Sequence, residues 1–375
     1  MYKLLFSLLM LSSTSIMTTN ANTGLRVQHH AENFSTVNDR YKMIRLENKS
    51  EESKIYGIER VFLTDDRIIV YDKYRLMIYT RDGKFVKSDI EMRGTKRNQY
   101  NEGYINEVAF DETEKELYVY TGNPSKIIVL DLDLNFKRTL DLDLGTNEKC
   151  IEMCISGNHI YALLCHKPQV ESYRLISFDK REFNNNLNSK ATTVLTFDKI
   201  MKPNFQLGRQ MTVCDDVYLT IPYCSKVYAL KDGGIYKQWD VQLADWFNYD
   251  ECKSMQDNEF IEKLRNQTVM MCSPIANQDI IIARTNNDVV RFDKKNDAPK
   301  AQTHYKFPGI PLTLVTPTPS QGRYGYAVLQ IHPNTTGFIN SYAEDNKNEV
   351  DDRILSTIKE VNKEDNPIIL IHKVE

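Results

Sequence analysis

The stretch that decides the fold lies near the start of the chain and reads Arg67-Ile-Ile-Val-Tyr-Asp72, then Arg75-Leu-Met-Ile-Tyr79. Both runs have strand length and are rich in β-branched and aromatic residues. Only Lys73 and Tyr74 separate them. The next segment, Arg81-Asp-Gly-Lys-Phe85, is a second turn that leads into a further strand. The stretch therefore predicts a small antiparallel sheet made of consecutive strands.

The same pattern returns five more times along the chain. One position in the first run of each pair can be followed through all six copies: Ile69, Tyr118, Tyr161, Tyr218, Ile281 and Tyr326. The steps between these positions are 49, 43, 57, 63 and 45 residues, and the shorter ones fit the ~40–50 residues of a four-stranded propeller blade. No helices alternate with the strands, which excludes a doubly wound parallel sheet. A sandwich does not require one motif to return six times, whereas a ring of similar sheets does.

The predicted fold class is therefore all-β, a six-bladed β-propeller with small helical insertions. We expect residues 1–21 to be a signal peptide, 22–40 a flexible N-terminal segment and 41–375 the six-bladed propeller. Lys3 precedes an apolar run from Leu4 to Leu11, which is shorter than the ~20 residues of a membrane helix, and small residues lead to Ala21. Since no cysteine precedes Cys150, the sequence predicts an exported protein, periplasmic or extracellular, that is not a lipoprotein.

The two ends of the predicted propeller and its insertions have their own patterns. Strand-like segments at Tyr41–Glu47 and Asn366–His372 are expected to pair in one blade and so close the ring. Helical insertions are expected near 241–266, with a helix at Asp257–Asn266, and near 348–363, with its apolar face packed on the outside of the ring.

The charge of the chain limits its partners. Its 375 residues carry 48 Lys and Arg against 51 Asp and Glu, a formal net charge of −3. Nucleic-acid and anionic-lipid binders need a clustered cationic surplus, so we expect neither partner, nor a membrane span, and we expect a monomer. The protein contains seven cysteines. A hairpin turn at Gly157-Asn158 would place Cys150 opposite Cys165, either as a disulfide or as two buried free thiols.

The segments Val70-Tyr71-Asp72, Arg81-Asp-Gly-Lys-Phe85 and the ending Asn366-Pro-Ile-Ile-Leu-Ile371 resemble those of the six-bladed β-propeller proteins of Bacteroidetes, which are distantly NHL-repeat-like. The resemblance covers roughly residues 41–375. The loop Arg93-Gly-Thr-Lys-Arg-Asn-Gln-Tyr100 keeps the Gly94 and Tyr100 of the family but lacks its proline and other glycines. The resemblance implies a fold and an exported location, and no assigned reaction.

The sequence does not decide whether the protein is an enzyme, and it favours a non-catalytic role. It has no nucleophile elbow or glycine-rich phosphate loop, and its histidines lack metal-ligand spacing, so no cofactor and no metal site is expected. Asp131-Leu-Asp-Leu-Asn135 lacks the glycine and the distant glutamate of a calcium loop and is predicted to be a strand running into a turn.

The candidate ligand-binding residues are polar side chains expected to face the propeller axis or its rim: Arg60, Arg93, Arg97, Tyr100, Tyr104, Asn106, Glu152 and Arg209. Arginine and tyrosine there could bind an anionic or sugar-like ligand through forked hydrogen bonds and stacking, while each taken singly could also be an ordinary solvated residue. The leading hypothesis is a ligand- or protein-binding module whose partner is a glycan, a peptide or an envelope protein. The alternatives are a metal-dependent hydrolase, lactonase or lyase with a site on the axis, and a scaffold for another envelope protein.

Overall fold

The computed structural model describes most of the chain from residue 41 to residue 373. The described ranges are 41–96, 98–100, 105–122, 125–142, 148–166, 172–184, 191–198, 209–214, 216–221, 225–242, 251, 254–266, 272–277, 279–285, 289–302, 309–311, 316–318, 320–321, 326–346 and 348–373.

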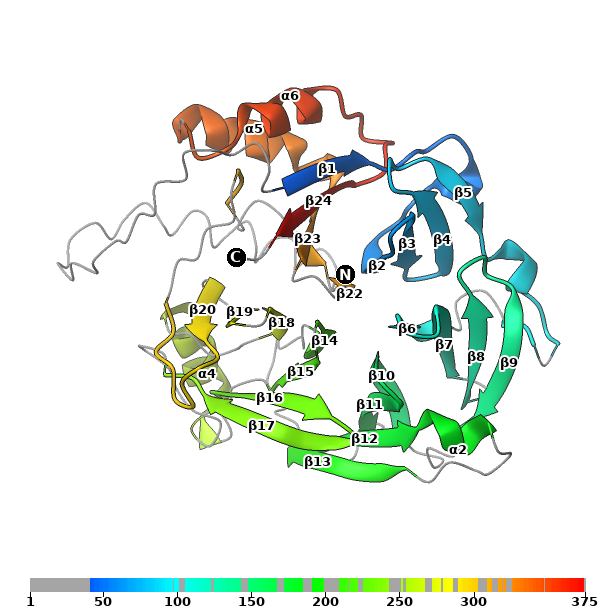
Figure 1. Cartoon of the computed structure of the whole chain (residues 1–375). Helices are drawn as coiled ribbons and strands as arrows, with labels where there is room; N and C mark the ends of the chain where they lie inside the picture. Colours follow the sequence, from blue (N-terminus) through cyan, green and yellow to red (C-terminus); the bar gives the residue numbers. More distant parts are fainter. Residues whose placement is uncertain are drawn as a thin grey trace. The chain divides into compact units, whose positions relative to one another are not determined.

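The strands form six sheets that follow one another around a common centre (Figure 1). This arrangement confirms the predicted all-β, six-bladed propeller. The first blade holds β2 to β5, at Ile58–Leu63, Arg67–Asp72, Arg75–Thr80 and Phe85–Ser88. The second holds β6 to β9, at Ile105–Asp111, Glu116–Gly122, Ser125–Asp131 and Phe136–Asp141. The third holds β10 to β13, at Glu148–Ser156, His159–His166, Ser172–Asp179 and Thr192–Asp198.

The other three blades continue the series. The fourth holds β14 to β17, at Met211–Val213, Val217–Thr220, Lys226–Lys231 and Gly234–Asp240, and the fifth holds β18 to β20, at Cys272–Ala276, Ile280–Arg284 and Val289–Asp293. The sixth holds β21, β23, β24 and β1, at Thr316–Thr318, Tyr326–Ile331, Ile368–Lys373 and Tyr41–Arg45. A short strand, β22 at Ser320–Gln321, pairs in parallel with β2.

The hydrophobic core lies between neighbouring blades rather than at one centre. Six apolar clusters are found among the described residues, and each draws its side chains mainly from two adjacent blades. The six repeated positions of the sequence all lie on the second strand of their blade: β3, β7, β11, β15, β19 and β23. Of these six, the five from Ile69 to Ile281 are completely buried. Each blade therefore needs its neighbours to bury both of its faces, which explains why the motif recurs.

The N-terminal strand closes the ring. β1 pairs with β24, which confirms the predicted pairing of the two end segments. The two strands are antiparallel, with Met43 opposite Leu370. The connection then runs against the first blade, where Glu47 N donates to Gly83 O at 2.8 Å. Gly83 has a φ of +88°, and a Cβ placed on it would lie 2.1 Å from the carbonyl oxygen of Arg45. Only glycine fits at this position, in the turn between β4 and β5, without moving the backbone.

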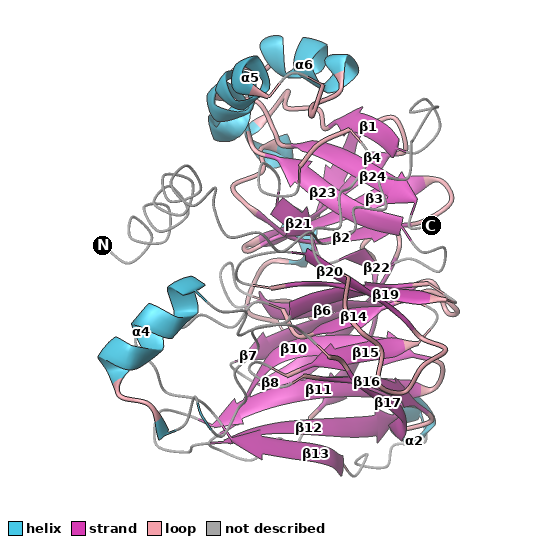
Figure 2. Ribbon diagram, turned by 90° about the vertical axis from the view of Figure 1, so that its left-hand side faces the viewer, coloured by secondary structure: helices cyan, strands magenta, loops and turns pink. Residues whose placement is uncertain are grey.

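Both predicted helices are present, and two further α-helices in the described part of the chain were not predicted. α4 spans Asp257–Asn266, and α6 spans Asp352–Lys359, inside the expected 348–363 segment. Ile354 and Ile358 of α6 are buried in the same cluster as Leu370, so its apolar face packs on the ring as expected. α5 at Thr336–Asp345 lies beside α6 (Figure 2). None of the helices in the described part of the chain is long and apolar enough to span a membrane.

The register predicted for the Cys150 hairpin is wrong by one residue. Ser156 lies opposite His159, as the Gly157-Asn158 turn requires, and this register holds as far as Glu152 opposite Leu163. A bulge at Ile151 then shifts the pairing, so Cys165 lies opposite Lys149 and Cys150 opposite Leu164. Neither Cys150 nor Cys165 is part of a disulfide.

Candidate ligand-binding site

One irregularity recurs where the inner strands of the first three blades begin. In β2, β6 and β10 the register shifts across a single residue, and the residue after this bulge is Arg60, Glu107 or Glu152, respectively. A bulge bends a strand and changes the direction of the neighbouring side chains. The repeated bulge thus brings charged side chains from three blades towards the propeller axis.

Glu107 is the centre of the resulting group. Its carboxylate is completely buried, and Oε1 lies 3.0 Å from Nε of Arg60. Oε2 accepts a hydrogen bond from Nη1 of Arg209, which lies two residues before β14 of the fourth blade. Val108 N also donates to Oε1, at 2.9 Å. A single carboxylate therefore serves two guanidinium groups.

Arg60 reaches from the first blade to the third. Its Nη1 donates to the carbonyl oxygen of Met153 at 2.9 Å and lies 3.9 Å from Sγ of Cys154. Its side chain is only 5% exposed. Its Nε lies 3.0 Å from Oε1 of Glu107 as an ion pair, but neither Nε nor Nη2 makes a hydrogen bond to any described residue. Buried donors are rarely left without a partner, because they lose their water hydrogen bonds on burial.

Glu152 connects the third blade to the fourth. Its carboxylate accepts from the backbone N–H groups of Gln210 and Met211, each at 2.9 Å. Burial raises its pKa to about 7, although Arg209 and Arg60 act in the opposite direction. Near neutral pH this carboxyl is therefore only partly charged.

Arg60, Glu107, Glu152 and Arg209 are called the axial charge cluster below. It reaches solvent through Arg209, whose side chain is 17% exposed, and through Glu59, which is 47% exposed and 3.8 Å from Arg209 Nη2. Blades one to four thus contribute one member each, from segments far apart in the sequence.

Three of the eight sequence candidates, Arg60, Glu152 and Arg209, come together in this cluster. Glu107 was missed, although Ile105-Asn-Glu-Val aligns with Ile58-Glu-Arg-Val and marks the same position in the repeat. Asn106 occupies the bulge of β6, where its Nδ2 would be 2.0 Å from a Cβ on Gly122.

Other candidates occupy a different site. Tyr100 donates to Oδ2 of the buried Asp89 at 2.6 Å, and Arg93 Nη2 donates to Oδ1 at 3.3 Å. Leu76 N donates to the same carboxylate, so this group attaches the loop to the first blade. Tyr100 is 3% exposed and offers no ring face to a ligand. Arg97 and Tyr104 lie outside the described residues.

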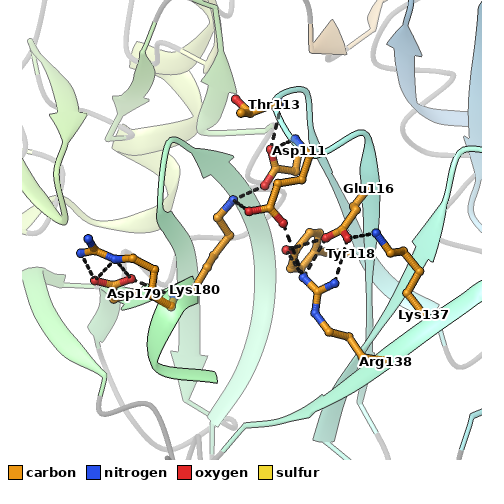
Figure 3. Close-up of polar contacts among 10 residues, drawn as sticks. Asp111, Thr113, Glu116, Tyr118, Lys137, Arg138, Asp179 and Lys180 are labelled. Atoms are coloured by element: carbon orange, nitrogen blue, oxygen red, sulfur yellow. Dashed lines mark hydrogen bonds and ion pairs between the residues drawn. The ribbon is translucent and has the colours of Figure 1, made fainter. Parts of the chain in front are cut away.

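A second charged cluster joins the second and third blades at the opposite ends of their inner strands. Lys180, in the short helix α2 at Lys180–Asn184, is bonded to Asp111 and lies 3.4 Å from Oε1 of Glu114 (Figure 3). Glu116 accepts from Lys137 and from both Nη atoms of Arg138. Burial alone would raise the pKa of Glu116, but these cations lower it to about 2. Cations and carboxylates are matched here, which fits a structural role.

The described residues contain no group of three His, Cys, Asp or Glu side chains arranged to hold a metal ion. Glu107 and Glu152 are bonded to arginine and to backbone N–H groups, respectively.

The sequence matches the model of one protein family, described as "Domain of unknown function (DUF4934)", over residues 25–373. The chain belongs to the DUF4934 family. No curated protein matches it.

Solved structures from two Bacteroides species have a similar fold. A "putative exported protein" of Bacteroides fragilis is 12% identical with a TM-score of 0.58, over 89% of this chain and 95% of that one. A DUF4221-family protein of Bacteroides vulgatus is 9% identical with a TM-score of 0.50, over 90% of this chain and 96% of that one. These likenesses show that this DUF4934 chain shares its fold with proteins of Bacteroides, as predicted. The NHL-like relation stays a prediction.

Proposed function

We propose that this DUF4934 protein is an exported, non-catalytic binding module that engages its ligand at the axial charge cluster. The observation that supports this proposal best is the buried Arg60, because its Nη2 has no acceptor among the described residues while its other nitrogens are in contact with Glu107 and Met153. A protein rarely buries a guanidinium in this way unless something else satisfies it.

The carboxylates of the cluster favour binding over catalysis. A general base or a metal ligand needs an oxygen that can reach the substrate or the ion. Glu107 divides its two oxygens between Arg60 and Arg209, and Glu152 accepts two backbone N–H groups. Both are therefore engaged in holding the blades. The competing hypothesis of a metal-dependent hydrolase, lactonase or lyase predicts a stoichiometric metal in elemental analysis of the purified protein.

The exported location is proposed from the signal-like segment at residues 1–21. We expect the mature protein to begin at Asn22 and to be recovered from the periplasm or the medium without a lipid. Intact-mass measurement tests this, since a retained first segment or an added acyl chain changes the mass.

A thermal-shift screen of glycans, peptides and metals tests the binding function, because a ligand of the folded state raises Tm. Ligands found in the screen are then measured with R209Q, which alters the solvent-facing edge of the cluster, and with K137Q, which alters a partly exposed lysine of the charged cluster between the second and third blades. Binding should be lost in R209Q and kept in K137Q. An absence of any ligand in all three classes, or equal binding by both variants, would contradict the proposal.

A further inference from the structure

We propose that the ligand of the axial charge cluster carries a carboxylate, and that Nη2 of Arg60 is the group that binds it. This inference rests on the function proposed above and specifies its ligand class.

Arg60 shares the carboxylate of Glu107 with Arg209. An arginine–carboxylate pair is commonly a fork, with two parallel N–H···O bonds. Arg60 has only its Nε beside Oε1 of Glu107, since Oε2 is bonded to Arg209. The nitrogen next to Nε on the guanidinium, Nη2, is left without an acceptor among the described residues. An acceptor supplied from outside would complete the fork.

The charges around Arg60 favour an anion at its guanidinium. Two guanidinium groups meet one fully buried carboxylate, that of Glu107. Glu152 directs its oxygens to backbone N–H groups, and the half-exposed Glu59 lies 3.8 Å from Arg209. Arg60 therefore shares its one carboxylate partner among the described residues with Arg209, and a ligand carboxylate at Nη2 would complete the compensation of its charge.

Neither described tyrosine that was considered for stacking offers a free ring face. Tyr100 is buried and bonded to Asp89. Tyr71, which lies near the cluster, is 3% exposed and donates to the carbonyl oxygen of Ile105 at 3.2 Å. The other aromatic candidate, Tyr104, lies outside the described residues. Among the residues that the structure describes, charge and hydrogen bonding are therefore the means of recognition that the cluster offers.

The experiment measures Tm and calorimetric binding in sodium acetate and sodium succinate against sodium chloride at equal ionic strength, with sodium sulfate as a second oxyanion. We expect a saturable response to the carboxylates. R60Q should weaken it roughly tenfold or more, because a charge-assisted hydrogen bond is lost. R67Q, which alters a partly exposed arginine at the far end of the blade, should leave it unchanged.

If R60Q does not fold, wild-type crystals soaked in 4-bromobenzoate, an unreactive aryl bromide, give the same answer, with a bromine signal expected beside Arg60. No saturable carboxylate response, a response to sulfate alone, or a carboxylate located away from Arg60 would overturn the inference. If neutral ligands then still bind in a manner that depends on Arg209, the proposed function stands and only the ligand class fails. If nothing binds, both fail.

Discussion

Glu107 is the residue on which the axial charge cluster depends most. In E107Q, Arg60 and Arg209 lose the carboxylate that they share, and a largely buried charge is left without compensation. Breaking a buried ion pair from one side costs about 3–5 kcal/mol, so we expect the free energy of unfolding to fall by that amount. Urea denaturation measures it. The matched control is E91Q, an exposed carboxylate that should change stability by less than about 0.5 kcal/mol. Equal effects of the two variants would show that the cluster does not stabilise the ring.

His372 gives the fold a dependence on pH. It is completely buried in β24 and stacked on Tyr41 at 5.3 Å, and burial lowers its pKa to about 4. The unfolded chain therefore takes up a proton near pH 6.5 that the folded chain refuses until about pH 4. Its contribution to stability is full above pH 6.5 and is lost as the pH falls, by about 3 kcal/mol in all.

The test for His372 compares the wild type with H372F, which keeps an aromatic ring against Tyr41 and cannot titrate. Asp72 and Glu152 have pKa values raised by burial to about 6 and about 7, so they act in the opposite direction over part of this range. They are present in both proteins and cancel in the difference. We expect H372F to gain stability relative to the wild type between pH 7.5 and pH 5 in urea denaturation. A constant difference would contradict the buried neutral imidazole.

At the scale of elements, strand order was predictable and strand register was not. The repeat identified the second strand of each blade, because β-branched and aromatic residues recur there at blade spacing. The bulges at Glu59, Asn106 and Ile151 have no comparable pattern, since any residue type can occupy an unpaired position. The missed bulge explains the wrong partner for Cys150. It also explains why Arg60, Glu152 and Arg209 could be named singly, while the meeting of Arg60 and Arg209 at Glu107 could not.

The connection between the second and third blades can be tested at Lys180. Its side chain is 5% exposed against 3% for Asp111. K180M leaves a buried carboxylate behind and should cost about 3 kcal/mol, whereas K137M removes a cation that is 42% exposed and should cost less than about 1 kcal/mol. The double variant D111N/K180M should recover part of the loss, because it removes the stranded charge while the amide oxygen can still accept from Thr113 N, as Asp111 does. Thermal denaturation of the wild type, K180M, K137M and D111N/K180M measures these differences. If the double variant recovers none of the stability lost in K180M, the broken ion pair is not the cause of that loss.

At the scale of the whole molecule, β1 belongs to two interfaces at once. Tyr41 is buried in the cluster between the fifth and sixth blades, together with α5 and α6. Ile44 is buried in the cluster between the sixth blade and the first. The five-residue strand therefore seals both sides of the last blade.

This double role predicts the effect of truncation. A chain that begins at Leu46 lacks β1, so β24 becomes an open edge, and the burial of Tyr41 and Ile44 is lost at about 1.5–3 kcal/mol each. We expect a lower Tm and self-association in size-exclusion chromatography. A chain that begins at Tyr41 keeps the strand and should behave as the longer protein does. A synthetic peptide of residues 41–47 should restore the truncated chain, since the site it leaves is specific in register, with Met43 opposite Leu370. If the chains that begin at Leu46 and at Tyr41 have the same Tm and both remain monomeric, the N-terminal strand does not close the ring.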